Sequence, residues 1–173
     1  GADAAATLRV RLDEGRSEGN SMKIAIGSDH AGFALKVTLL TWLLENGYDV
    51  VDLGTYNDER VDYPHYGALV GRAVASGEVD LGVAVCGSGQ GICMAANKVP
   101  GVRGGVIRDE ADAEITRRHN NANVACFGER FTEPDVAVAS LKVFLETGFD
   151  GGRHATRVGQ LERLDETHGI GEV

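Results

Sequence analysis

The sequence is poor in aromatic residues and has no long apolar run. Aromatic residues make up 6% of its 173 positions. No stretch approaches the roughly 20 apolar residues that a membrane-spanning helix needs. The hydrophobic share of 43% still suffices for one soluble domain with a full core. The 24 glycines and the many small aliphatic residues suit helices that pack closely on a parallel sheet.

Positive charge is also scarce. Lys and Arg number 17 against 26 Asp and Glu, which gives a formal net charge of −9. Because nucleic acids and membrane surfaces are polyanions, this balance predicts neither as a partner. A small anionic substrate stays open, since a local group of Arg and His can hold one phosphate.

Cysteine is limited to Cys86, Cys93 and Cys126, with no paired spacing and no CxxC motif. This pattern suggests neither a zinc site nor a disulfide framework. The sequence also shows no secretory apolar segment. Free thiols persist in a reducing compartment, so we expect a cytoplasmic protein.

Residues 1–21 differ from the rest of the chain. They are polar, charged and rich in Gly and Ala, and Met22 then opens a sharp apolar run. We interpret residues 1–21 as an N-terminal extension or an expression remnant, and residues 22–173 as one domain.

From Met22 onward, short apolar runs alternate with segments that have helical spacing. The expected strands lie near residues 23–30, 48–54, 79–86, 102–109 and 123–130. The expected helices lie near residues 33–46, 64–76, 92–98, 110–121, 132–148 and 154–166. This alternation predicts a three-layer αβα fold, a doubly wound, Rossmann-like parallel sheet of about five strands in a single domain with a further C-terminal helix.

Three residues are expected to mark helix ends. Gly47 stands where the first helix needs a C-terminal cap, and Asp109 and Thr132 stand before the fourth and fifth helices. In a fold of this class, ligands bind at the carboxyl ends of the strands, close to the switch in strand order. The segments that follow the strands are therefore the ones to search for a site.

Cys86 ends an apolar strand and directly precedes the glycine loop Gly87-Ser88-Gly89-Gln90-Gly91. A cysteine is more often a buried core thiol. Here, however, the following backbone can turn several N–H groups toward one point, which favours a thiolate and can hold an oxyanion. Cys93 and Cys126 lack this setting, and we expect both to be structural.

The glycine loop fits three familiar motifs poorly. A dinucleotide fingerprint needs its third glycine one place later and an acidic residue after the next strand. A P-loop needs Gly-Lys-Ser or Gly-Lys-Thr, and a cysteine phosphatase is expected to have an Arg in this loop; neither is present. The loop alone is weak evidence for a functional site, and it becomes stronger evidence only because Cys86 precedes it.

Two pairs of polar residues also lie at ends of elements. Asp29-His30 follows the first strand, where such a pair is either a solvated turn or part of a site at the edge that carries Cys86. His119-Asn120 ends a helix, where both residue types are favoured for structural reasons alone.

Arg153 and Arg157 lie four residues apart and share one face if this segment is helical. A solvated basic face is the ordinary interpretation of such a pair. Two guanidinium groups can also bind one phosphate through charge-assisted hydrogen bonds. Composition does not decide between these alternatives.

Taken in order, six motifs resemble type B ribose-5-phosphate isomerases, within the wider ribose/galactose phosphate isomerase family. They are GSDHAGF, DYPHY, CGSGQGICMAANK, RRHNNANV, FGER and GGRHATRV, and the resemblance covers roughly residues 22–166. Each motif alone is weakly specific, but the ordered set is highly specific. Some family members have a Glu base and no cysteine at this position, so this chain resembles the cysteine branch.

The resemblance implies a set of catalytic roles. Cys86 would move a proton between C1 and C2 of the sugar. His119 would open the furanose ring, with Asp29 assisting at the ring oxygens. Ser88 and the loop amides would steady the enediolate. The implied amides are those of Gly87, Gly89 and Gly91.

The resemblance also implies binding roles. Tyr63 would line the sugar pocket, and Asn120 would bind a substrate oxygen. His30, Arg153 and Arg157 would hold the phosphate. Arg130 would be an additional contact to the phosphate. No metal or other cofactor is implied.

The implied activity is the interconversion of ribose 5-phosphate and ribulose 5-phosphate through ring opening and an enediolate. Isomerases of galactose-, allose- or erythrose-type phosphates, a non-catalytic phosphosugar-binding module and a nucleotide-binding domain are the alternatives. The family resemblance further implies a homodimer or homotetramer whose pocket is shared between two chains.

Overall fold

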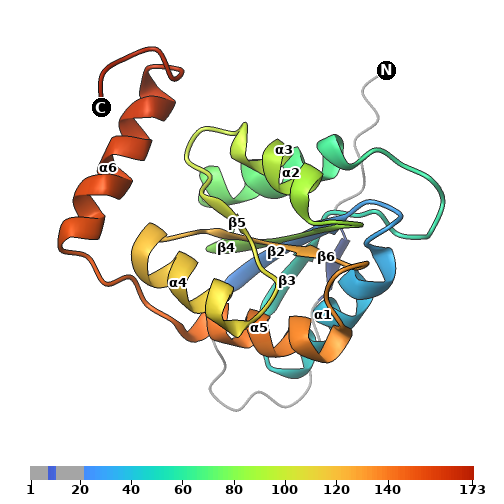
Figure 1. Cartoon of the computed structure of the whole chain (residues 1–173). Helices are drawn as coiled ribbons and strands as arrows, with labels where there is room; N and C mark the ends of the chain where they lie inside the picture. The colour runs from blue at the N-terminus through green and yellow to red at the C-terminus, as the bar shows by residue number, and fades with distance from the viewer. Residues whose placement is uncertain (1–7, 11–21) are drawn as a thin grey trace.

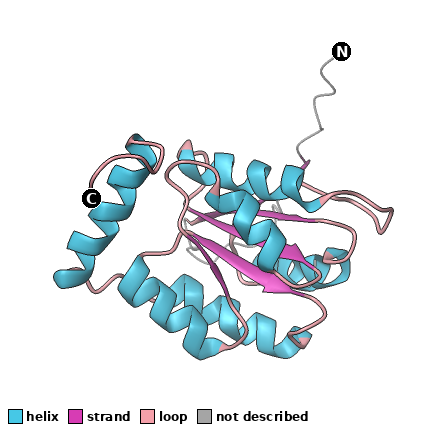
Figure 2. Cartoon of the chain, turned by 45° about the horizontal axis from the view of Figure 1, so that its top comes forward, coloured by secondary structure: helices cyan, strands magenta, loops and turns pink. Residues whose placement is uncertain are grey.

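A six-stranded sheet in the order β1-β3-β2-β4-β6-β5 runs through the centre of the molecule, with helices on both faces (Figures 1 and 2). The structure is a computed structural model that describes residues 8–10 and 22–173. The strands are β1 (Leu8–Val10), β2 (Lys23–Ser28), β3 (Asp49–Asp52), β4 (Leu81–Cys86), β5 (Gly104–Val106) and β6 (Val124–Gly128). The helices are α1 (Phe33–Glu45), α2 (Tyr63–Ala75), α3 (Gln90–Asn97), α4 (Glu110–Asn120), α5 (Pro134–Glu146) and α6 (Arg153–Glu166).

Strands β2 to β6 are mutually parallel, which confirms the expected fold class of five parallel strands between helical layers. Strand β1 is an addition that the sequence did not predict. It belongs to the N-terminal segment and pairs antiparallel with β3, Arg9 opposite Val51. The rest of the expected extension, residues 1–7 and 11–21, lies outside the described residues.

The two faces of the sheet carry separate apolar cores. Helices α1, α4 and α5 cover one face, where Leu39, Leu141 and Phe144 are fully buried. Helices α2 and α3 cover the other, around Val70 and Ile92. The central strands β4 and β6 are buried along their whole length, which explains why their sequences are continuous apolar runs. Within the described residues, no helix combines the length and apolarity needed to cross a membrane.

Two of the three expected cap residues are confirmed. Gly47 has φ of +81°, and the N–H groups of Gly47 and Tyr48 donate to the carbonyls of Leu44 and Leu43, which is a Schellman motif. Asp109 caps α4, since its carboxylate accepts from the Asp112 N–H at 2.8 Å.

The expected cap at Thr132 is wrong. Helix α5 begins at Pro134 with Glu133 as the flanking residue, because proline fits the first helical turn. Thr132 belongs to the preceding turn, where its N–H donates to the Gly128 carbonyl. Its hydroxyl is buried and has no hydrogen-bond partner among the described residues.

Helix α3 begins earlier than expected, at Gln90 instead of Ile92. Gly89 is left-handed, with φ of +78°, and forms the flanking position. Gly91 therefore lies inside the helix. A Cβ at Gly91 would come within 2.6 Å of the Tyr63 ring, so close packing explains this glycine better than a loop does.

The segment after β6 holds the glycine loop by backbone contact. The N–H groups of Glu129 and Arg130 donate to the carbonyls of Cys86 and Gly87, each at 3.0 Å. A Cβ at Gly128 would lie 2.4 Å from the Ser88 carbonyl carbon. Only glycine at position 128 permits this approach, which fixes the loop after Cys86 against β6.

We expect two substitutions in α1 to differ in their effect on the free energy of unfolding, because one side chain is buried and the other is exposed. Leu39→Ala should lower the free energy of unfolding by about 2–5 kcal/mol, because it leaves a cavity in the core. Val37→Ala, at a side chain that is 42% exposed, should change it by less than about 0.5 kcal/mol. Urea unfolding of both variants tests this; equal losses would contradict the described packing of α1.

We expect Gly128→Ala to lower the free energy of unfolding by about 1–3 kcal/mol, because the added methyl group collides with backbone. Gly159→Ala is the matched control: it lies in α6 with nothing within 4 Å of the new Cβ. That control should be stabilised by about 0.5–1 kcal/mol through helix propensity. Thermal unfolding measures both, and an unaffected Gly128→Ala protein would refute the close contact.

Candidate active site

The ends of β2 and β4 meet at the switch in strand order. The chain passes from β2 to β3 on one side and returns to β4 on the other, and Ser28 pairs with Val85 at the ends of the two strands. Asp29 and Cys86 directly follow these positions. They therefore lie where open α/β sheets bind their ligands.

Cys86 is the last residue of β4, and its side chain faces α2 and α3. It is 4% exposed, so the thiol lies beneath the surface of the isolated chain and not on an open rim. Its sulfur accepts the Gly89 N–H at 3.1 Å. This donor is the first of the backbone groups that the glycine loop was expected to supply.

The glycine loop leads directly into the N-terminus of α3. The first N–H groups of a helix have no partner within it and carry partial positive charge. Ser88 is half-buried, and its hydroxyl accepts the Gln90 N–H at 3.2 Å. The Tyr63 ring lies against Gly91 in the same first turn. Loop and helix together offer several donors near one thiol, a setting for negative charge.

Asp29 and His30 occupy the segment after β2. Asp29 is 6% exposed, and its Oδ1 accepts the Gly32 N–H at 3.0 Å. The Nδ1 of His30 lies 3.0 Å from the Val61 carbonyl oxygen and 3.2 Å from the Val61 nitrogen. His30 also lines a cavity of about 480 Å³ with Tyr56, Asn57 and Glu129. The contact with Val61 orients the ring toward that space.

The segment after β6 adds two charged residues to this edge. The guanidinium of Arg130 lies over Gly87, where a Cβ would be 3.1 Å from its central carbon. The Oε1 of Glu129 accepts the Leu35 N–H at 2.7 Å, so this carboxylate caps the start of α1. No local pattern predicts that cap, because 94 residues separate the two partners.

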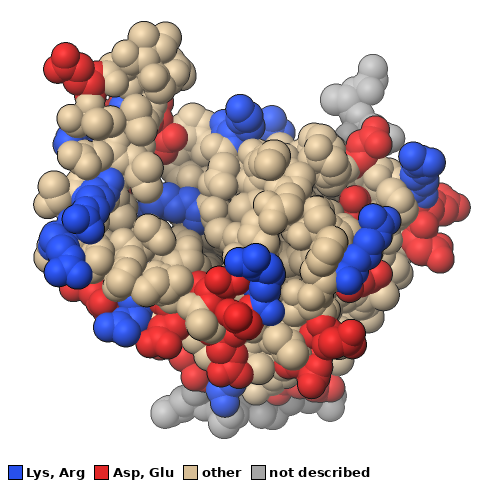
Figure 3. Space-filling view, in the orientation of Figure 1, with Lys and Arg blue, Asp and Glu red and all other residues tan. Residues whose placement is uncertain are grey.

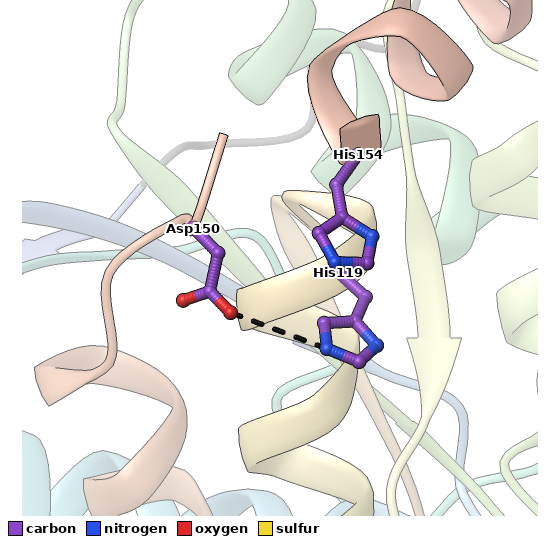
Figure 4. A group of neighbouring side chains, drawn as sticks. All are labelled: His119, Asp150 and His154. Carbon is purple, nitrogen blue, oxygen red and sulfur yellow. Dashed lines mark ion pairs between the residues drawn. The ribbon is translucent and has the colours of Figure 1, made fainter. Parts of the chain in front are cut away.

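A second polar cluster joins the end of α4 to the start of α6 (Figure 4). The rings of His119 and His154 stack with centroids 4.1 Å apart and planes 9° from parallel. Asp150 approaches His119, with 4.0 Å between the carboxylate and Nε2. His119 and Asn120 also line a cavity of about 510 Å³ together with Arg157.

Positive charge dominates the surroundings of this cluster. Arg118 lies 3.2 and 3.3 Å from the two carboxylate oxygens of Asp150. Partial removal from water lowers the pKa of His154, and repulsion from His119, Arg153 and Arg157 lowers it further. Figure 3 shows Lys and Arg side chains gathered over α6. Two imidazoles and a carboxylate are possible metal ligands, but this charge balance favours an anion over a cation.

Within one chain, the two clusters lie at opposite ends of the parallel strands, one at the carboxyl ends and the other at the amino ends. Helix α4 returns antiparallel to the strands, so its end, with His119, lies where β6 begins. Cys86 lies where β4 ends. In Figure 1, α6 and the end of α4 are on the left and α1 is on the right, and Figure 2 agrees. One chain alone therefore does not bring His119 to Cys86.

The structure sorts the sequence-predicted residues into these two groups. The first comprises Asp29, His30, Tyr63, Cys86, Gly87, Ser88, Gly89, Gly91 and Arg130. The second comprises His119, Asn120, Arg153 and Arg157. Sequence reasoning missed Asp150 and left His154 undecided, although Asp150 directly precedes the GGRHATRV motif and His154 lies within it.

The other two cysteines lie in the core on the α3 face. Cys126 is fully buried, and burial first of all raises the pKa of its thiol well above the ordinary value. A hydrogen bond with Cys126 lowers the pKa of Cys93. Cys86 is also only 4% exposed, so burial does not separate the three thiols, and the structural role of Cys93 and Cys126 stays a prediction.

Comparisons with known proteins show the family to which the chain belongs. The family model described as Ribose/Galactose Isomerase matches residues 24–161. Ribose-5-phosphate isomerase B of Escherichia coli K12 is 43% identical over 144 residues, which are 83% of this chain and 97% of that protein.

Solved structures are similar to this chain over nearly their whole length. Ribose-5-phosphate isomerase B of Clostridium thermocellum is 46% identical, with a TM-score of 0.84 over 85% of this chain and 99% of that one. The Mycoplasma genitalium enzyme, solved with bound ribulose-5-phosphate, is 40% identical, with a TM-score of 0.80 over 83% of this chain and 96% of that one. The chain therefore belongs to the ribose/galactose isomerase family.

Proposed function

We propose that this protein interconverts ribose 5-phosphate and ribulose 5-phosphate. The observation that carries the proposal is the position of Cys86 at the switch point, beside the Gly89 N–H and the N-terminus of α3. A relative that is 40% identical was solved with ribulose-5-phosphate bound. We also propose that residues 22–173 form the isomerase domain and that the protein acts in the cytoplasm.

The reaction begins with ring opening, because only the open-chain aldehyde has an acidified C2 proton. His119 donates a proton to the ring oxygen and accepts one from the C1 hydroxyl, since imidazole serves as both acid and base near neutral pH. The stacked ring of His154 and the carboxylate of Asp150 hold His119 in place for this exchange. Asp29 assists at the ring oxygens.

Proton transfer between the two carbons follows. The Cys86 thiolate takes the proton from C2, and the electron pair moves to form the enediolate. Negative charge then develops on the carbonyl oxygen, where Ser88 and the amides of the glycine loop stabilise it. The proton of the C2 hydroxyl passes to the oxygen on C1, and the Cys86 thiol returns the carbon-bound proton to C1. These transfers give the ketose and regenerate the thiolate, so no net oxidation occurs.

The phosphate is held away from the reacting carbons. His30, Arg153 and Arg157 contact it through charge-assisted hydrogen bonds, with Arg130 as a further contact, while Tyr63 and Asn120 contact the sugar. This remote binding energy fixes the reacting carbons near Cys86.

The site is completed by a second copy of the chain. His119, Arg153 and Arg157 lie at the opposite end of the strands from Cys86. One copy therefore supplies the base with His30 and Arg130, and another supplies the ring-opening His119 and the two arginines that bind the phosphate. A two-fold symmetric pair places both sets together twice. We propose a homodimer or a homotetramer built from such pairs.

We expect Cys86→Ala to lower kcat for ribose 5-phosphate by about 10²–10⁴-fold, as for loss of a general base. Its affinity for inorganic phosphate, measured by calorimetry, should stay close to that of the wild type. Cys93→Ala is the matched control and should retain activity. Full activity of Cys86→Ala would refute the assignment of Cys86 as the base. If the wild type converted a hexose or tetrose phosphate as fast as the pentose phosphate, the assignment of ribose 5-phosphate as the substrate would be refuted.

Mixing two inactive variants tests the shared site. Cys86→Ala and His119→Ala subunits that exchange freely should regain about a quarter of wild-type activity, because half of the dimers are hybrids with one intact site each. A mixture of Cys86→Ala with Cys86→Ser should regain none, because every site lacks the thiol. Equal failure of both mixtures, with subunit exchange shown by mass spectrometry, would place the whole site in one chain.

A further inference from the structure

A charged lysine is sealed inside the layer between α1 and the sheet. Lys36 is 1% exposed and ranks among the largest fully buried side chains of the described residues. Burying an ammonium group is costly unless it is paired and hydrogen-bonded. The position of Lys36 therefore calls for an explanation beyond packing.

The partner of Lys36 is Asp52, the last residue of β3. The Nζ group donates to Oδ1 at 2.9 Å and to Oδ2 at 3.1 Å, and it also donates to the Thr55 carbonyl. The Phe33 and Tyr56 rings lie 5.4 and 5.3 Å from the ammonium group. The ammonium group thus binds the last residue of β3 through two hydrogen bonds and the segment that follows β3 through a third.

Asp52 fixes the same segment a second time. Its Oδ1 accepts the Gly54 N–H at 3.0 Å, and its backbone carbonyl accepts the Tyr56 hydroxyl at 3.0 Å. Asp52 is itself only 5% exposed. The ion pair and these bonds lock residues 52–56 onto α1.

This locked segment in turn holds the end of β2. The Ser28 N–H donates to the Gly54 carbonyl at 2.7 Å, and the Thr55 N–H donates to the Ser28 carbonyl at 2.8 Å. Ser28 directly precedes Asp29 and His30. Tyr56 also lines the cavity that contains His30. A continuous chain of polar contacts therefore runs from Lys36 to Ser28, the residue before Asp29.

We propose that the buried Lys36–Asp52 pair is a positioning device that sets the Asp29–His30 segment for catalysis. The expected effect of this pair on turnover rests on the proposed function. An apolar pair of similar size would fill the same space, but it would not direct the Gly54 and Thr55 backbone toward Ser28. The ion pair thus contributes orientation to a site that needs its groups placed to within a fraction of an ångström.

The test uses a neutral pair of nearly unchanged shape, Lys36→Met with Asp52→Asn. The amide oxygen introduced by Asp52→Asn can still accept the Gly54 N–H, and no buried charge is left alone, so the protein is expected to fold. The Lys36 bond to Thr55 and the ion pair are both lost. We expect kcat for ribose 5-phosphate to fall by about 10-fold or more, as for a small misplacement of reacting groups. The imidazole resonances of His30 should shift in NMR spectra.

The matched control removes an exposed ion pair in the same way. Arg108 lies 3.2 Å from Asp112, and its side chain is 70% exposed. Arg108→Met with Asp112→Asn should leave kcat and the His30 resonances unchanged. A merely structural role for Lys36 predicts a lower melting temperature with wild-type kcat per folded molecule, and that result would overturn the proposal.

If the double variant does not fold, Asp52→Glu carries the test. It keeps the buried charge of Lys36 paired, but it moves the carboxylate away from the position in which Asp52 accepts the Gly54 N–H. The proposal then requires a reduced kcat together with shifted His30 resonances in the folded protein; wild-type values of both overturn it. Failure of the wild type itself to convert ribose 5-phosphate would refute the proposed function, while the His30 resonances would still test the positioning.

Discussion

The backbone contact between Gly128 and Ser88 is the constraint on which the rest of the site depends. It lets the segment after β6 lie directly on the glycine loop, and hydrogen bonds to the Cys86 and Gly87 carbonyls fasten the two together. Once the loop is fixed, Gly89 adopts its left-handed conformation and α3 begins at the next residue. The Cys86 sulfur then faces a backbone donor at the switch in strand order, and the site acquires its electrostatic character from main-chain groups.

Much of this arrangement follows from local sequence patterns. Alternating apolar runs predicted the five parallel strands, and the Asp109 and Gly47 caps followed from residue chemistry. The start of α3 and the cap of α5 were predicted wrongly, because tertiary contacts decided both. Gly91 packs against the Tyr63 ring inside α3, and Thr132 belongs to the turn in which its N–H donates to the Gly128 carbonyl. The candidate site residues were found largely through ordered motifs, since no local rule links His119 to Cys86.

Long-range polar contacts were beyond sequence reasoning. The Glu129 cap of α1 joins residues 94 positions apart, and the Lys36–Asp52 pair joins a helix to the end of a strand. A lysine in an amphipathic helix is ordinarily predicted to have a solvated side chain. Only the fold reveals that its ammonium group is buried. Such contacts place the groups of an active site, whereas local patterns decide which elements exist. The division of the polar residues between the two ends of the strands likewise follows from the topology.

The most direct measurement is a crystal structure of the protein with a linear five-carbon sugar-phosphate analogue bound. We predict that the Cys86 sulfur lies within about 3.5 Å of the carbon that corresponds to C1 or C2. We further predict that the phosphate contacts Arg153 and Arg157 of the chain that does not supply this sulfur. An analogue whose reacting carbons lie far from Cys86, or one enclosed entirely by residues of a single chain, would contradict the proposed mechanism.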